Sequence, residues 1–134
     1  MIEYQITAKR EDAHGSVAHC KQAEITIDTD INGRVDAFNP AELLLAAVAA
    51  CILKSIERVA LMIHFNYQGV TIEVHGQRQD TPPRINHIDY KIIVDTDEND
   101  GKLLLLHHNI QKFGTIYNTV SAATRLEGTL IRQE

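Results

Sequence analysis

The chain has 134 residues, of which 44% are hydrophobic and 23% charged, and its formal net charge is −5. This length predicts one domain that buries about two-thirds of the surface of the unfolded chain, and the composition argues against disorder. The chain has no run of Lys and Arg and only three Phe, four Tyr and no Trp. Nucleic-acid binders combine basic patches with stacking aromatic side chains, so the composition excludes that class of partner.

The amino-terminus, MIEYQITAK, alternates polar and apolar residues and lacks the basic start and apolar stretch of a signal peptide. We therefore expect a cytoplasmic protein with no membrane segment. The two cysteines, Cys20 and Cys51, form neither a CxxC pair nor a zinc-type spacing with histidines. We expect free thiols, with no disulfide scaffold, no metal site and no cofactor.

Strong alternation of polar and apolar residues at positions 2–8 predicts a half-buried strand at the start of the chain. A polar turn is expected over 10–15, followed by a second strand region over 16–27. The two are predicted to pair as an antiparallel hairpin.

The segment 28–39, DTDINGRVDAFN, is predicted to be the loop that leads into the central helix. Its opening resembles a calcium-binding loop. The bidentate acid of such a loop is replaced by Asn39, and the preceding segment has strand character rather than helix character. A plain turn is therefore favoured over a calcium site.

The segment Asn39 to Met62 predicts the helix around which the rest of the chain is organised. Asn39 suits the cap position, Pro40 suits the first turn, and Glu42 puts a negative charge at the positive end of the helix dipole. From Leu43 onward, eleven residues carry no polar group except a cysteine thiol. This run is shorter than the roughly 20 residues of a membrane span, so it predicts a buried core helix.

A helix that is apolar on every side has to be enclosed on every side. A domain of five or six strands and two helices is too small to enclose it. We therefore expect a second copy of the chain to supply the missing wall, which predicts a homodimer.

The second half of the chain predicts strands at 70–74, at about 88–94 and at 126–132, with an acidic capping loop at 95–101. Between the last two strands, a one-sided apolar stripe predicts an amphipathic helix. Its members are Leu103, Leu106, Ile110, Phe113, Tyr117 and Val120. Gly114 interrupts this stripe, and it either ends the first part of the helix or allows a neighbour to approach closely. The element order indicates an α+β fold with antiparallel sheet.

Three stretches, NPAELLLAAVAAC, PPRINHIDYKIIV and KFGTIYNTVSAATRLEGTL, resemble the OsmC/Ohr family of osmotically inducible and organic-hydroperoxide-resistance proteins. The resemblance covers essentially the whole chain. It is most specific where an acid precedes a cysteine by nine residues in a helix of small residues. It implies an α+β fold, an intertwined homodimer with buried central helices, and active sites at the dimer interface.

The resemblance also implies site residues. Cys51 matches the peroxidatic cysteine, Glu42 matches the glutamate that orients an arginine over the thiolate, and Arg10 is the best match for that arginine. The family's second, resolving cysteine is replaced here by Gly114. Cys20 is then a possible resolving thiol, provided that it comes close enough to Cys51 to form a disulfide.

These residues predict a peroxiredoxin-like function, the reduction of organic hydroperoxides in oxidative-stress defence, with an external thiol as reductant. A thiolate, rather than a thiol, attacks a peroxide, and a nearby cation has to offset the cost of burying that anion. The alternative is a non-catalytic dimer that has lost the redox cycle and binds a small apolar ligand. The histidines do not indicate a metal site. The adjacent His107 and His108 point to different faces of a helix, so they cannot bind one metal ion together, and the other histidines show no ligand spacing.

Overall fold

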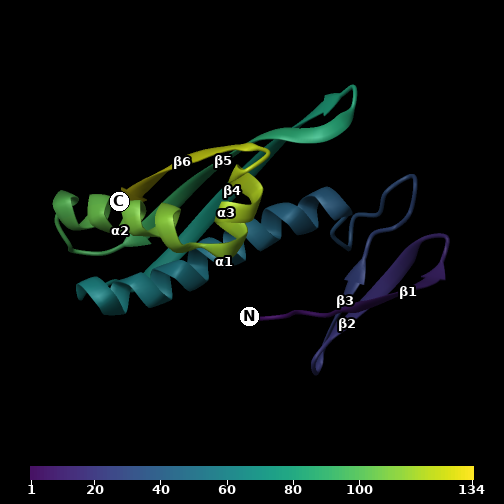
Figure 1. Ribbon diagram of the computed structural model, residues 1–134, viewed down its shortest axis with the longest axis horizontal. Helices are drawn as coiled ribbons and strands as arrows, with labels where there is room; N and C mark the ends of the chain where they lie inside the picture. Colours follow the sequence, from purple (N-terminus) through teal and green to yellow (C-terminus); the bar gives the residue numbers. More distant parts are fainter. The chain divides into compact units, whose positions relative to one another are not determined.

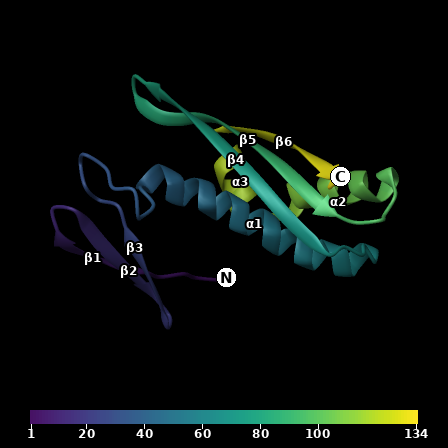
Figure 2. The same cartoon turned by 180° about the vertical axis from the view of Figure 1, so that it is seen from behind.

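The computed structural model describes all 134 residues, which divide into two compact units, Met1–Leu44 and Leu45–Glu134. Each unit contains its own three-stranded sheet (Figure 1). Figure 2 shows the same elements from behind. The α+β class expected from the sequence is confirmed. No helix combines the length and the apolar character that crossing a membrane requires.

The first unit is built on three antiparallel strands, β1 (Thr7–Asp12), β2 (Gly15–Cys20) and β3 (Ala23–Ile27). Residues that are paired across strands share a face of the sheet. The register therefore puts one largely apolar set of side chains on the same face: Ala8, Arg10, Ser16, Ala18, Cys20, Ala23, Ile25 and Ile27. We call this set the apolar face of the first sheet. The other face carries Thr7, Lys9, Val17, His19, Glu24 and Thr26.

Two strand boundaries in the first unit differ from the expectation. The first strand begins at Thr7 rather than at position 2, because its partner strand ends at Cys20 and leaves the earlier residues without a ladder. The strand also runs through Arg10 to Asp12, so the turn is confined to two residues. The region 16–27 is two strands rather than one, and Lys21 adopts a left-handed conformation (φ 57°) in the tight turn between them.

The loop between β3 and the central helix is organised by the buried carboxylate of Asp28, which is 5% exposed. It accepts hydrogen bonds from the backbone N–H groups of Asp30 and Arg34, each at 3.1 Å. Asp30 in turn accepts from the N–H of Asn32 at 2.8 Å. Aspartates that bond to their own backbone in this way stabilise turns, so the turn prediction is confirmed.

The central helix α1 spans Pro40–Ile63, close to the predicted bounds. Its start is a reciprocal pair in which Asn39 Oδ1 accepts from the Glu42 N–H at 2.8 Å and Glu42 Oε1 accepts from the Asn39 N–H at 3.0 Å. Its end has no basic residue of its own. Instead, Lys102 Nζ donates to the carbonyls of Ile63 and His64, at 2.8 and 3.1 Å. Both ends of the helix are therefore satisfied by side chains.

The second unit is built on the sheet of β4 (Gly69–Asp80), β5 (Pro83–Asp95) and β6 (Arg125–Arg132), in that order. Strands β4 and β5 form a long antiparallel hairpin, whereas β5 and β6 are parallel. The parallel pair departs from the expected antiparallel sheet. Its cause is the helical crossover after β5, which returns the chain to the end of the sheet where β5 began.

The crossover consists of α2 (Asp100–Phe113) and α3 (Thr115–Ser121), which divide the predicted apolar stripe between them. Asn99, which lies in the predicted capping loop, caps α2 and accepts from the Lys102 N–H at 2.9 Å. Gly114 lies between the two helices with φ −75° and ψ 124°, so it ends the first part of the stripe.

All the fully buried apolar side chains belong to the second unit. Figure 1 shows α1, α2 and α3 on the same side of the sheet. Every second residue of β5 from Ile88 to Val94 is buried. The largest buried side chains are Ile52, Ile56, Ile88, Ile92, Leu106, Ile110, Val48, Val59 and Val94. Burying each such side chain stabilises the folded state by about 1.5–3 kcal/mol before entropy is counted. The enclosure of α1 is incomplete in a single chain, because Leu53, Leu61 and Met62 stay 41%, 81% and 57% exposed.

Candidate functional site

Cys51 lies in the middle of α1, at the point where the apolar run gives way to an amphipathic pattern, and it is half-buried. Its sulfur packs against the backbone of Gly114. A Cβ built on Gly114 would lie 2.9 Å from Cys51 Sγ, 3.0 Å from Tyr117 Cβ and 3.5 Å from Ser55 Oγ. Both alternatives for Gly114 therefore apply at once: it ends a helix and it lets a neighbour approach closely.

Tyr117, one turn beyond Gly114, is held by a buried chain of hydrogen bonds. Its hydroxyl lies 3.3 Å from the Tyr90 hydroxyl, which lies 2.7 Å from His107 Nε2. Burial, followed by the bond to Tyr117, raises the pKa of Tyr90 well above its usual value, and burial lowers the pKa of His107. Both groups are therefore neutral near pH 7, and the three side chains fix α2 and α3 on β5.

Glu42 has a defined task in the structure. It closes the first turn of α1 through the reciprocal bonds with Asn39. Arg10 and Glu42 both belong to the first unit, and no ion pair joins them there. The expectation that Glu42 orients Arg10 stays a prediction.

Arg10 projects from the apolar face of the first sheet, directly across from Ser16. The only other arginine of this unit, Arg34, is committed to Asp36 by two bonds of 2.6 and 2.9 Å. The hydrogen bond from Arg34 lowers the pKa of the Asp36 carboxyl. Arg10 forms no ion pair, so it is the arginine of this unit that is free to bind another anion.

Cys20 lies at the end of β2, on the same apolar face, and its thiol donates to the Gln5 carbonyl at 3.5 Å. Cys20 and Arg10 belong to the first unit, and Cys51 belongs to the second. That Arg10 or Cys20 comes close to Cys51 stays a prediction.

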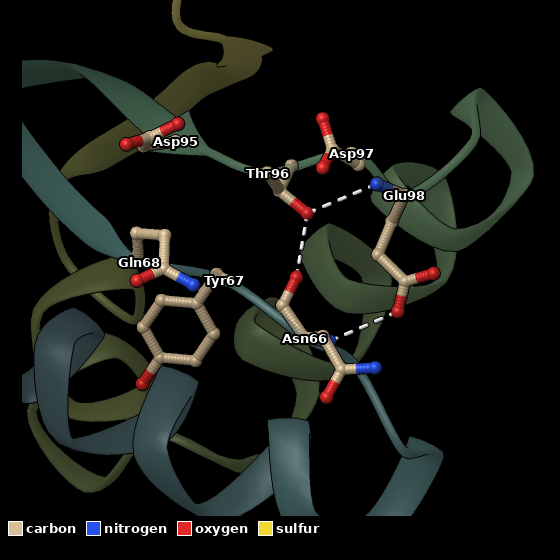
Figure 3. A pocket seen from close by; sticks show the side chains of 7 residues that line it. All are labelled: Asn66, Tyr67, Gln68, Asp95, Thr96, Asp97 and Glu98. Carbon is tan, nitrogen blue, oxygen red and sulfur yellow. Dashed lines mark hydrogen bonds between the residues drawn. The ribbon is translucent and has the colours of Figure 1, made fainter.

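A polar cavity of about 310 Å³ lies at one end of the second unit, and no cysteine is among the residues that line it. Figure 3 shows the residues that line it: Asn66, Tyr67, Gln68, Asp95, Thr96, Asp97 and Glu98. Thr96 donates to the Asn66 carbonyl at 2.6 Å and accepts from the Glu98 N–H at 3.0 Å, while Glu98 Oε2 accepts from the Asn66 N–H at 2.9 Å. These bonds join the loop before β4 to the loop after β5. We therefore assign the residues around the cavity a structural role, which is to hold the two loops together.

Two features near Cys51 were not predicted from the sequence: the buried Ser55 and the hydrogen bond between Tyr90 and His107. Ser55, one turn after Cys51, is 4% exposed. The sequence does carry a signal for it, because a serine on the apolar side of a core helix has to find a hydrogen-bond partner. The bond between Tyr90 and His107 joins β5 to α2, and no local pattern signals such a long-range pair.

The fold and the cysteine-bearing central helix are those of an OsmC-type protein. The family model described as OsmC-like protein matches residues 32–128. The chain therefore belongs to the OsmC family. A comparison with curated protein sequences found no match.

Solved structures share this fold. The OsmC-like protein from Mycoplasma pneumoniae has 19% sequence identity and a TM-score of 0.90, and the match covers 99% of each chain. An organic hydroperoxide resistance protein OsmC from Legionella pneumophila has 17% identity and a TM-score of 0.73 over the full length of both chains. The organic hydroperoxide resistance protein OhrB of Bacillus subtilis has 17% identity and a TM-score of 0.68, with 96% of this chain and 98% of OhrB covered.

Proposed function

We propose that this chain reduces organic hydroperoxides through a single peroxidatic cysteine, Cys51, in oxidative-stress defence in the cytoplasm. The observation that carries the proposal is a half-buried thiol in the middle of the central helix of an OsmC-family fold. Two relatives of the same fold are named organic hydroperoxide resistance proteins, which supports the substrate class. The apolar residues around Cys51 favour a hydrophobic peroxide over hydrogen peroxide.

The first chemical step is a two-electron oxidation of sulfur. The Cys51 thiolate attacks the terminal oxygen of the hydroperoxide, so that an S–O bond forms while the O–O bond breaks. The leaving alkoxide takes a proton and departs as an alcohol. Cys51 is left as a sulfenic acid.

The thiolate needs a cation, and Arg10 is the proposed source. An opposite charge within about 4–6 Å favours the ionised form of a group by roughly 1–3 pKa units. Arg10 forms no ion pair and is exposed, as is every residue of β1, so its guanidinium is available to an anion. Glu42 is the proposed tether for its guanidinium, because two parallel bonds to a carboxylate hold an arginine in a fixed plane.

A homodimer is the proposed active form, with both units of each chain combined in one OsmC-like domain. In the first unit, apolar side chains such as Ile6, Ile25 and Phe38 are 60%, 50% and 55% exposed. A unit that consists of a three-stranded sheet and exposes that much apolar surface needs a cover to be stable. The family match runs across the boundary between the units, which supports treating them as one functional domain.

Return of the sulfenic acid to the thiol requires a second thiol, which Gly114 cannot provide. We propose an external thiol: its sulfur bonds to Cys51, water leaves, and a further thiol then releases Cys51 as a disulfide forms between the two reductant sulfurs. Cys20 is the internal alternative.

The test of the first step is to treat the protein with cumene hydroperoxide in the presence of a sulfenic-acid trap and to locate the adduct by mass spectrometry. We expect one adduct, on Cys51, at substoichiometric peroxide. The Cys51→Ser variant should lose peroxide consumption completely, whereas the matched Cys20→Ser variant should retain the first turnover. A wild-type protein without an adduct on Cys51 would rule out the peroxidase.

The second candidate is a non-catalytic dimer that binds a small apolar ligand, and the absence of a thiol at Gly114 favours it. In that case, Cys51→Ser would leave binding unchanged, and peroxide would not be consumed by either protein.

The replaced resolving cysteine can itself be tested. In a disulfide, the Cβ of one cysteine lies about 3 Å from the sulfur of the other, given an S–S bond of about 2.05 Å. A Cβ at position 114 would lie 2.9 Å from Cys51 Sγ. We expect Gly114→Cys to form an intramolecular disulfide with Cys51 on addition of peroxide, detected as a mass loss of two hydrogens in the Cys20→Ser background. A free, alkylatable pair after peroxide treatment would contradict it.

A further inference from the structure

The backbone conformation does not explain why residue 114 is glycine. Its φ of −75° and ψ of 124° are open to any residue. Its surroundings do explain it, because Gly114 is buried and a Cβ there would lie 2.9 Å from Cys51 Sγ. Unbonded atoms do not approach so closely. The sulfur of Cys51 can therefore occupy its position only because residue 114 has no side chain.

A second polar group converges on the same point. Ser55 follows Cys51 by four residues on α1, so the two side chains share one face of the helix. Ser55 Oγ lies 3.5 Å from the position of a Cβ on Gly114, and Cys51 Sγ lies 2.9 Å from that same position. Ser55 is 4% exposed, so its side chain is almost entirely enclosed by the fold.

We propose that Ser55 is a positioning residue for Cys51: its hydroxyl donates a hydrogen bond to the sulfur when the sulfur is ionised, and the missing Cβ of Gly114 leaves the space in which the two groups meet. A hydrogen bond to an ionised acceptor is roughly twice as strong as one between neutral groups, so this bond selects the thiolate over the thiol. The role in catalysis rests on the proposed peroxidase function, whereas the bond itself does not. Ser55 is not a catalytic residue, because it acts through Cys51.

The competing explanation is structural. A serine inside a helix often bonds to the carbonyl four residues earlier, which here is that of Cys51 itself. Such a bond would stabilise or bend the helix, but it would leave the ionisation of the sulfur unchanged. The pH dependence of thiol reactivity therefore separates the two roles.

The experiment measures the rate of Cys51 alkylation by iodoacetamide as a function of pH, in the Cys20→Ser background so that one thiol reports. We expect Ser55→Ala to move the midpoint of the profile to higher pH and to slow alkylation below the midpoint by about two- to tenfold, the factor expected for one hydrogen bond. Ser55→Thr keeps the hydroxyl and should keep the wild-type profile. Ser55→Val has the shape of threonine without the hydroxyl and should behave like alanine.

Two further variants complete the experiment, one as a negative control and one as a second test. Ser121→Ala removes another helical hydroxyl, one that donates to the Asn118 carbonyl at 3.3 Å at an exposed position of α3. It should leave the profile unchanged. Gly114→Ala forces the sulfur away from its position, so it should shift the midpoint in the same direction as Ser55→Ala.

Equal profiles for the threonine and valine variants would overturn the inference, and this comparison holds even if the alanine variant does not fold. The inference and the proposed function fail separately. A shifted midpoint in a protein whose Cys51 forms no sulfenic acid would support the hydrogen bond and refute the peroxidase. An unshifted midpoint with a normal sulfenic acid would do the reverse.

Discussion

The two units of the chain obtain their stability in different ways. In Leu45–Glu134, three helices and a mixed sheet surround a continuous apolar core that includes Val48, Ile88 and Ile92, each 0% exposed. In Met1–Leu44, the buried non-glycine residues are polar ones, Ser16 and Asp28. The second unit can stabilise itself, whereas the first has an ordered sheet and an organised loop but no core of its own. Its apolar face points to an assembly in which another surface completes it.

The largest expected effect comes from removing a side chain from the core of the second unit. Ile92→Ala should lower the free energy of unfolding by about 2–5 kcal/mol, because it loses buried apolar contacts and leaves a cavity. Urea denaturation followed by circular dichroism measures this loss. A cost below about 1 kcal/mol would mean that the core is less well packed than its burial indicates.

A smaller effect, and one on assembly, is expected at the apolar face of the first sheet. Ile25→Lys puts a charge on the face that a second copy is proposed to cover, so the dimer dissociation constant should rise by more than about tenfold. Sedimentation velocity over a dilution series measures it. Thr26→Lys adds the same charge to the opposite face of the same strand and should leave the dimer intact. Equal behaviour of the two variants would remove the distinction between the faces.

The junction of the two units, where α1 begins, gives an effect of about 1 kcal/mol. Asn39→Ala removes the acceptor for the Glu42 N–H and should cost about 0.5–2 kcal/mol of stability. Glu42→Gln keeps the reciprocal bonds and removes only the interaction of the charge with the helix dipole, so it should cost less than about 1 kcal/mol of stability. If Glu42 also tethers Arg10, the glutamine variant should slow the reaction of Cys51 with peroxide while Asn39→Ala should not. A slow Asn39→Ala variant would show that helix capping, rather than charge, controls the reactivity.

The smallest effect distinguishes the units by the sign of their pH dependence. Burial lowers the pKa of His107 in the second unit, so its contribution is present above the unfolded value of about 6.5 and is lost as the pH falls through the folded pKa. In the first unit, the hydrogen bond to Asp30 raises the pKa of His14. Its contribution is therefore present below the unfolded value and is lost as the pH rises through the folded pKa.

Melting temperatures at pH 5 and pH 8 test this difference. Relative to wild type, His107→Gln should lose less stability on going to pH 5, and His14→Gln should lose more. A shift in the same direction for both variants would contradict the assignment.

Much of the fold could be predicted because its signals are local. The cap at Asn39, the charge at Glu42 and the apolar run that follows define α1 within a few residues of the chain. The alternation in β4 and the capping of α2 by Asn99 are equally local. The start of β1 could not be predicted, since the alternation continues to position 2 while the ladder stops where β2 ends. The parallel pairing of β6 depends on where the crossover returns the chain, which no local pattern states.

The candidate site divides in the same way. Cys51 could be named from the sequence because its helix resembles that of the OsmC/Ohr family, and Gly114 could be named because it interrupts the apolar stripe of the second helix. That the sulfur and Gly114 touch could not be predicted, since the contact joins α1 to a helix end more than sixty residues later. Ser55 was missed because it follows Lys54, so in the sequence it looks like part of the polar side of the amphipathic half of α1.

The reciprocal bonds at the start of α1 have a consequence for how the protein can be observed. A Glu42 carboxylate that turns toward a guanidinium has to release the Asn39 amide, which then meets solvent. Hydrogen exchange at that one amide therefore records when the glutamate has left its helix, and it does so without any label on the sulfur or the arginine.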